Sequence, residues 1–347
     1  MHYFSEDSLT NVQANEKAQQ LAFAPIAFQA ARLLCKTGIL KFIQSKGPEG
    51  ATLAEVQKKM KVPAYGVKVL LESGLGSGLL LYKNQRFVTT KTAYMLLFDP
   101  MTRVNMDFTH DVCYAGMFHL DKSIKKRKPA GLKKLGKWKT IYEGLSKLDP
   151  QVKKSWFDFD HYYSDLAFPK ALPIVFEKRP KKILDVGGNT GKWAKLCTEY
   201  DSKVKVTIAD LPGQLSMARP KGRIKGYEID VLDSKQKFPK GYDVIWMSQF
   251  LDCFSPKEIT SILKRARKAM TKGSSLYILE TYWDRQANQT AAFCLQQTSL
   301  YFTCLANGNS QMYHSEDMQK CVEKAGLKIA EDRAIEGSYH TLFRCVI

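Results

Sequence analysis

A short apolar run that ends in three glycines is the feature that most restricts the fold of this chain. Residues 183–186 are Ile-Leu-Asp-Val, and glycines follow at positions 187, 188 and 191. An apolar run that breaks into glycines indicates a buried parallel strand followed by a tight turn into a helix. In open α/β sheets such a turn lies at the carboxyl edge of the sheet, where ligands bind. We therefore expect an α/β domain with a ligand site at this turn.

The order of residues in the turn argues against a dinucleotide. A dinucleotide turn has the pattern Gly-x-Gly-x-x-Gly and faces a diphosphate, whereas this one is Asp-x-Gly-Gly-x-x-Gly. The carboxylate of Asp185 would repel a phosphate and suits an ammonium group. A second predicted strand ends at Asp210, where an acid can accept hydrogen bonds from both ribose hydroxyls. S-adenosylmethionine, a nucleoside with an amino-acid tail and no phosphate, fits both features. The alternative is an α/β domain whose glycines only close a turn.

Residues 181–280 resemble the S-adenosylmethionine-dependent O-methyltransferases of the caffeic acid and hydroxyindole type, which include bacterial members. The matching segments, in family order and spacing, are Asp-Val-Gly-Gly-Asn-Thr-Gly at 185–191, Asp-Leu-Pro at 210–212, Glu-Ile-Asp-Val at 228–231, Tyr-Asp-Val-Ile-Trp-Met-Ser at 242–248 and Leu-Tyr-Ile-Leu-Glu at 276–280. The match is weaker before residue 150. The resemblance implies an α/β fold: a Rossmann-like, seven-stranded methyltransferase sheet with an N-terminal, mostly α-helical winged-helix domain.

The matching segments also imply which residues hold the cofactor. We expect S-adenosylmethionine at the carboxyl edge of the first four strands of the sheet, in contact with Asp185, Gly187, Gly188, Gly191, Asp210, Leu211, Asp230, Val231 and Ser248. No cluster has metal-ligand spacing, so we expect no metal.

The first hundred residues carry the pattern of a winged helix. Thr52 and Glu55 form a capping box that opens one helix, Val62-Pro63 turns the chain into a second, and two short apolar segments predict a hairpin at 79–89. A winged helix is first a DNA-binding shape. However, Lys68 is the only basic residue between Val62 and Gly78, where a recognition helix would lie, and DNA readers place several polar or basic side chains there. The pattern therefore disfavours nucleic acid.

Residues 11–34 predict a helix with apolar side chains around much of its circumference. A helix without a polar face is normally buried, and at a chain end its partner can be a second subunit. The resembling family dimerises through its N-terminal domain and uses it as a lid over the substrate pocket. We therefore expect a homodimer.

The pattern divides the chain into three parts. We expect a winged-helix dimerisation domain at 1–110, a linker with pocket-lining helices at 111–165, and the cofactor-binding methyltransferase domain at 166–347. Strands are predicted at 182–186, 204–209, 224–229, 242–247, 275–280, 327–333 and 340–346. Helices are predicted at 167–177, 191–200, 213–219, 256–270, 286–305 and 315–325.

The catalytic residues depart from the family pattern. The family has a catalytic His on the edge of the fourth strand, and this chain has Asp252 there. Glu280 matches the acid that steadies the His, whereas a second acid, expected near Gln311-Met312, is absent. Three readings follow: Asp252 is a carboxylate base whose pKa is raised by burial and by Glu280, the acceptor is already acidic, or the site methylates something other than oxygen. His161 and His314 are further candidate bases, though each more often serves as a surface or pocket polar group.

The densest aromatic cluster, residues 156–163, is Trp-Phe-Asp-Phe-Asp-His-Tyr-Tyr. Aromatic residues here could be core, but their mixture with acids and a His predicts that some line a pocket for a flat ring. The expected acceptor-binding residues are Phe159, His161, Tyr162, Tyr163 and Met312.

The chain has 53 basic and 34 acidic residues, a net charge of +19, and nine Lys or Arg lie in Lys122–Lys139 without an acid. This excess is usual for a solvated surface, but it also allows an anionic acceptor or an acidic carrier protein that delivers it. Eight scattered cysteines without a Cys-x-x-Cys pair indicate reduced thiols. With no signal peptide and no long apolar run, we expect a cytoplasmic protein without a membrane segment.

We therefore predict an S-adenosylmethionine-dependent methyltransferase, most simply an O-methyltransferase of an aromatic or polyketide-like small molecule. The alternative is a non-catalytic or repurposed protein that keeps the nucleoside site, either as a ligand sensor or as a DNA-associated regulator.

Overall fold

The computed structural model describes residues 4–347 and forms two compact units, one ending at Asp107 and one spanning Phe108–Ile347. Residues 111–165, expected to be a separate linker, belong to the second unit. Within the described residues, no helix combines the length and apolar content needed to cross a membrane.

The first unit is a winged helix preceded by one long helix. Its elements are α1 (Asn11–Lys36), α2 (Ile39–Ser45), the 3-10 turn η1 (Gly47–Glu49), α3 (Leu53–Lys59), α4 (Ala64–Gly76), β1 (Leu80–Lys83), β2 (Arg86–Thr89), α5 (Lys91–Phe98) and α6 (Pro100–Asp107). The capping box forms as predicted, because the Thr52 side chain accepts from the Glu55 N–H and the Glu55 carboxylate accepts from the Thr52 N–H. Asn84 and Gln85 close the hairpin at φ of 49° and 61°, as a two-residue hairpin turn requires.

Most residues of helix α1 are exposed. Of its residues, Leu34 alone is buried. Four large apolar side chains along it, Val12, Leu21, Phe23 and Ile26, are between 60% and 69% exposed. Exposed apolar surface of this extent is normally covered by another protein surface.

The second unit is built on a seven-stranded sheet, as predicted. The strand order is β5 (Ile224–Glu228), β4 (Lys205–Asp210), β3 (Lys182–Val186), β6 (Val244–Ser248), β7 (Ser275–Glu280), β9 (Thr341–Val346) and β8 (Lys328–Ala334). The first five strands are parallel, and β9 is antiparallel to both of its neighbours. All carboxyl ends of the parallel strands therefore meet at one edge, with β3 and β6 side by side at the point where the strand order reverses.

The remaining elements of the second unit are helices and short turns. They are the π-helical η2 (Phe108–Tyr114), α7 (Ala115–Met117), α8 (Leu120–Lys126), η3 (Leu132–Lys134), η4 (Ile141–Glu143), η5 (Leu145–Lys147), α9 (Pro150–Phe176), α10 (Lys192–Tyr200), α11 (Pro212–Ala218), η6 (Leu251–Cys253), α12 (Pro256–Ala269), η7 (Trp283–Arg285), α13 (Gln289–Tyr301), the π-helical η8 (Phe302–Ala306) and α14 (Ser315–Lys324). The helix predicted at 167–177 is wrong at its start, because α9 is one continuous helix from Pro150, capped by the Asp149 side chain.

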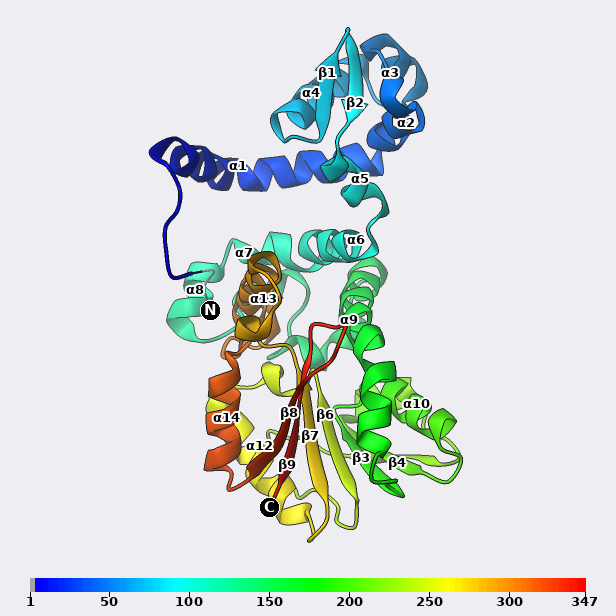
Figure 1. The fold of residues 1–347 in the computed structure, drawn as a ribbon, viewed down its shortest axis with the longest axis vertical. Helices are drawn as coiled ribbons and strands as arrows, with labels where there is room; N and C mark the ends of the chain where they lie inside the picture. The colour runs from blue at the N-terminus through cyan, green and yellow to red at the C-terminus, as the bar shows by residue number, and fades with distance from the viewer. Residues whose placement is uncertain (1–3) are drawn as a thin grey trace. The chain divides into compact units, whose positions relative to one another are not determined.

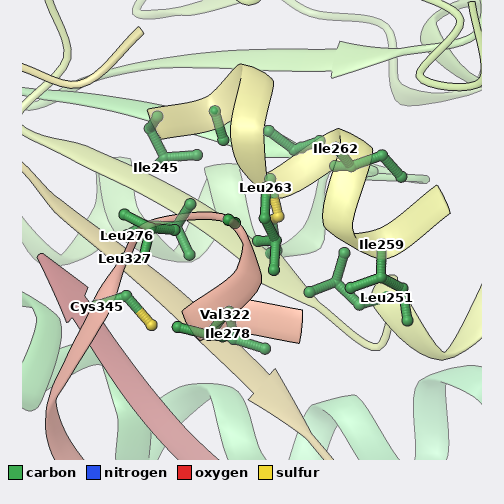
Figure 2. Packing of buried hydrophobic residues seen from close by; sticks show 14 of the residues in the cluster. Ile245, Leu251, Ile259, Ile262, Leu263, Leu276, Ile278, Val322, Leu327 and Cys345 are labelled. Atoms are coloured by element: carbon green, nitrogen blue, oxygen red, sulfur yellow. The ribbon is translucent and has the colours of Figure 1, made fainter. Parts of the chain in front are cut away.

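Helices cover both faces of the sheet (Figure 1). Helices α9 and α10 lie on one face, where Trp193, Trp246 and Phe168 are buried together. Helices α12 and α14 lie on the other, where Leu263 of α12 and Val322 of α14 pack against strand residues such as Ile278 (Figure 2). The central strands β6 and β7 are buried and almost wholly apolar, and their polar residues lie at the strand ends.

Candidate active site

A cavity of about 340 Å³ opens at the carboxyl edge of the parallel strands. Its walls come from the β3–α10 turn, the ends of β4 and β6, η6, the middle of α9 and residues 298–312. The volume is in the range of small-molecule sites. The glycine turn, where the sequence predicted a ligand site, therefore lies at a cavity.

Two glycines are required where β3 turns into α10. Gly187 has φ +72°, and a Cβ there would lie 2.2 Å from the Phe250 ring. A Cβ on Gly188 would lie 2.5 Å from Oδ2 of Asp185. Any side chain would fill the approach to the turn or displace these neighbours, so the backbone itself forms this wall.

Asp210 at the end of β4 fastens this turn. Its Oδ2 accepts the Asn189 N–H at 2.9 Å, and its Oδ1 accepts the Leu211 N–H at 2.7 Å. Burial raises the pKa of Asp210 to about 6, and the two N–H groups oppose that shift. Each carboxylate oxygen keeps a lone pair for a ligand hydroxyl. Asp230 is exposed at the rim, where its Oδ1 accepts the Leu232 N–H at 2.9 Å.

Several buried oxygens around the cavity have no hydrogen-bond partner among the described residues. They are Asp185 Oδ2, Asn189 Oδ1, Ser248 Oγ and Gln249 Oε1. Burial, and then the charge of Asp210, raises the pKa of Asp185 to about 8. Buried polar atoms normally have partners, and these oxygens all accept hydrogen bonds. The set fits a ligand rich in N–H and O–H donors, as an adenosine with an ammonium tail is.

Asp252, in the cavity wall, and Glu280, which does not line the cavity, are two buried carboxyl groups. Oε1 of Glu280 accepts the N–H groups of Phe250 and Leu251 at 3.0 and 2.8 Å, which fixes the η6 turn that carries Asp252. Asp252 lines the cavity, and its Oδ1 contacts the Cys253 thiol at 3.4 Å. Burial raises the pKa of both groups, and Asp252 raises that of Glu280 further. A carboxyl with a raised pKa at this place can take up a proton near neutral pH.

Aromatic side chains form the other end of the cavity. The rings of Phe108 and Phe159 stack at a centroid distance of 3.9 Å, and the Trp156 indole donates to the Tyr301 hydroxyl at 2.7 Å. Met312 lies here at the place where the family has its second acid, and its N–H donates to Ser299 Oγ at 3.1 Å. This end offers flat apolar surfaces with few free polar groups, which suits an aromatic ring.

The two candidate histidines lie in different places. His161 lines the cavity with Nε2 3.3 Å from Thr190 Oγ1. Burial and then Lys192 lower its pKa to about 4, so its imidazole is neutral at pH 7. His314 lies outside the cavity lining and caps α14 through the Glu316 N–H.

Most of the predicted site residues line this one cavity. They are Asp185, Gly187, Gly188, Asp210, Leu211, Asp230, Val231, Ser248, Asp252, Phe159, His161 and Met312. Gly191 does not line the cavity but is the N-cap residue of α10, with φ +75°. Glu280 does not line the cavity either, and its carboxylate holds the η6 turn that carries Asp252. Tyr162 and Tyr163 are also outside the lining, where their rings contact each other edge to face.

The wall residues that sequence reasoning missed include Asp160, Asn189, Gln249 and Phe250. A signal existed for Asn189, because Asn tolerates the φ of +49° that it adopts after the paired glycines. Nothing in the pattern distinguished Asp160 from its neighbour Asp158, which is exposed and pairs with Lys154. Among the described residues, no group of three or more His, Cys, Asp or Glu is arranged to hold a metal ion.

Comparison with known proteins shows the same two parts. A family described as "Methyltransferase domain" matches residues 159–332, and a "Dimerisation2-like domain" matches residues 15–87. The chain is 22% identical over 315 residues to the L-tyrosine C(3)-methyltransferase of Streptomyces lavendulae, covering 88% of this chain and 85% of that protein.

Two solved structures illustrate the fold. Human N-acetylserotonin methyltransferase in complex with S-adenosylmethionine has a TM-score of 0.67 and 17% identity, with 99% of this chain and 98% of that one covered. The O-methyltransferase NcsB1 from neocarzinostatin biosynthesis, in complex with S-adenosylmethionine and 2-hydroxy-5-methyl naphthoic acid, has a TM-score of 0.68 and 18% identity, with 98% and 99% covered.

Proposed function

This chain belongs to the methyltransferase family whose domain spans residues 159–332, and we propose that it transfers the methyl group of S-adenosylmethionine to an oxygen of an aromatic small molecule. The observation that carries the proposal is that one cavity is lined by the carboxyl edge of the sheet, by aromatic side chains and by Asp252.

The cofactor end is formed by groups that suit an adenosine with an amino-acid tail. The residues that would hold it are Asp185, Gly187, Asn189, Asp210, Asp230 and Ser248. Bound there, S-adenosylmethionine supplies an electrophilic methyl carbon. The carboxylate of Asp210 would accept the ribose hydroxyls while it keeps the turn in place, and Asp185 Oδ2 would accept from the ammonium group.

The acceptor end needs positioning and one proton acceptor. Phe108, Phe159 and Tyr301 would hold the ring flat and exclude water, which contributes to catalysis by fixing the approach of the acceptor. A phenol has a pKa of about 10, so a base must accept its proton. We assign that role to Asp252, and a positioning role to Glu280, which holds the η6 backbone.

A second candidate is methylation of a ring carbon. The tyrosine C(3)-methyltransferase, which this chain matches over most of both proteins, acts on carbon. Removing the proton of a phenol also enriches the neighbouring ring carbon in electrons, so the same base serves either reaction.

We also propose that the protein is a homodimer and is located in the cytoplasm. A homodimer formed through the first unit is supported by the Dimerisation2-like match and by the exposed apolar side chains of α1. A cytoplasmic location is supported by eight cysteines that are all free thiols.

The test combines binding with product analysis. Titration calorimetry is expected to show binding of S-adenosylmethionine and S-adenosylhomocysteine, and labelled cofactor is expected to transfer its methyl group into members of a panel of phenols. Nuclear magnetic resonance of the product then locates the methyl group on oxygen or carbon. A protein that binds neither nucleoside would refute the proposal, and one that binds both without methylating any phenol would favour a ligand sensor.

A further inference from the structure

The charge of the cavity is opposite to that of the protein. The chain carries 53 basic and 34 acidic residues, a net charge of +19. Seven residues that line the cavity are Asp or Glu, whereas Lys192 is the one Lys or Arg among the lining residues that the structure describes. Lys192 is already engaged, because its Nζ lies 2.7 Å from Asp165 Oδ1. An acidic cavity in a basic protein indicates a ligand with positive charge.

Most of these acids already have a task. Asp185, Asp210 and Asp230 lie at the nucleoside end. Glu258 accepts the N–H and hydroxyl of Ser255 at 2.8 and 2.6 Å as the cap of α12. Glu143 is exposed at the rim, 3.4 Å from the Lys139 N–H.

Asp252 is the proposed base, and Asp160 is the one acid of the cavity still without a role; neither is paired with a Lys or Arg among the described residues. Asp160, on α9, keeps 28% of its side chain exposed although it belongs to the cavity wall. Its Oδ2 accepts from Asn189 Nδ2 at 3.3 Å and lies 4.0 Å from the neutral His161. Asp252, on η6, is only 6% exposed and has the Cys253 thiol beside it.

Two neighbouring carboxyls in a largely apolar wall are costly to charge. Burial and then the charge of Asp252 raise the pKa of Asp160 to about 7. A cation bound beside them would restore the charged forms, because an opposite charge at close range offsets the loss of hydration. Phe159 and Trp156 line the same cavity, and aromatic rings attract cations.

We infer that the acceptor carries a protonated amine that binds to Asp160, next to Asp252, while its ring lies against the aromatic wall. The amine-bearing acceptor has no free carboxylate, since no unengaged Lys or Arg lines the cavity in the described part of the chain. The inference rests on the proposed function and runs against the anionic acceptor that the net charge allowed.

Matched phenols that differ only in charge test this inference. Tyramine carries an ammonium group, 4-propylphenol replaces it by a methyl group, and 3-(4-hydroxyphenyl)propionate replaces it by a carboxylate. Tyrosine and its methyl ester test the free carboxylate, and the corresponding meta isomers test a second geometry. Binding to the complex with S-adenosylhomocysteine is measured by calorimetry, so that no turnover is needed.

The amine is expected to bind at least about tenfold more tightly than the neutral phenol in one of the two geometries, as a charge-assisted hydrogen bond provides. The carboxylate should bind most weakly, and the methyl ester of tyrosine more tightly than tyrosine. Asp160→Asn should reduce the preference for the amine to below about threefold, whereas Asp158→Asn, which removes the same charge from the exposed side of α9, should preserve it.

Equal affinity for amine and neutral phenol, or no binding of any amine to the nucleoside complex, would overturn the inference. So would an Asp160→Asn variant that loses S-adenosylhomocysteine affinity instead of the preference for the amine, because Asp160 would then serve the cofactor. If the protein binds no nucleoside, the proposed function fails. The preference for the amine over the neutral phenol is then measured in titrations without S-adenosylhomocysteine. Methylation on nitrogen would support the amine-bearing acceptor while refuting oxygen as the methylated atom.

Discussion

In the proposed reaction Asp252 accepts the proton of the acceptor, and it lies on a turn that Glu280 fastens through two backbone N–H groups. General-base help contributes about 10²–10⁴ in rate. Asp252→Asn should therefore lower turnover at least about 100-fold, and the affinity for S-adenosylhomocysteine should change little, as measured by calorimetry.

Asp252→Glu is the matched control, because it keeps the carboxyl group and should retain more activity than the Asn variant. If Asp252→Asn loses less than about tenfold in turnover, Asp252 only shapes the turn. An acceptor that is already ionised would then explain the rate, since His161 is a weak base with its lowered pKa.

Asp160 makes the stability of the unliganded protein depend on pH. Its pKa is about 7 in the folded protein and 3.8 in an ordinary Asp. Between these values the folded state holds a proton that the unfolded chain has released, so stability is present at low pH and lost as pH rises. Asp160→Asn should be more stable than the wild type by about 1–3 kcal/mol at pH 8.

The difference should fall below about 1 kcal/mol near pH 4, where the folded state is protonated and the unfolded chain, with a pKa of 3.8, is roughly half protonated. Thermal melts of the two proteins from pH 4 to pH 8 measure it, at about 2–4 °C for each 1 kcal/mol. If the difference in melting temperature between the two proteins stays constant from pH 4 to pH 8, Asp160 does not have the raised pKa on which this prediction depends.

The residues of the nucleoside edge could be predicted because backbone geometry dictates them. Only glycine fits at Gly187 and Gly188, and an acid at a strand end such as Asp210 has a place that topology fixes. The acceptor wall could not be predicted in the same way. Asp158 and Asp160 are two positions apart on α9, and which of them faces the cavity depends on how the helix packs.

At the scale of elements, the β3–α10 turn and the end of β4 act as one unit because Asp210 joins them. Asp210→Ala should weaken S-adenosylhomocysteine binding by about 1–3 kcal/mol, since it removes hydrogen bonds to a charged group. Calorimetry measures the loss. Asp201→Ala is the control, because Asp201 makes a similar backbone hydrogen bond, to the Lys203 N–H, in the loop before β4. Equal losses in the two variants would mean a general effect on the sheet.

The strands were predicted to within two residues at each end, whereas α9 was not. Strands buried on both faces give continuous apolar runs bounded by glycine or charge. The part of α9 that was predicted, residues 167–177, contains both Pro169 and Pro173, whereas the missed part, residues 150–166, mixes aromatic and charged side chains around the helix and lacks the amphipathic period by which helices are found. Tertiary packing, which a local pattern does not contain, keeps it continuous.

At the scale of the whole molecule, the exposed apolar side chains on several sides of α1 predict a homodimer. The double variant Leu21→Lys with Ile26→Lys places two charges among side chains that are each 67% exposed. It should shift the protein from dimer to monomer at micromolar concentration, as measured by light scattering. Phe118→Lys, at a 91% exposed site of the second unit, is the control and should leave the dimer intact. A monomeric wild type would contradict the prediction directly.

The acidic cavity in a protein of charge +19 has a consequence for kinetics. The long-range field of the protein repels a cation in solution, whereas the carboxylates attract it only after it has entered. Salt screens the long-range repulsion far more than the attraction inside the cavity. Added salt should therefore accelerate the association of a positively charged small molecule and leave its dissociation nearly unchanged. The usual electrostatic steering of a ligand toward its site is thereby reversed: the enzyme would select its cationic ligands by how long they stay and not by how fast they arrive.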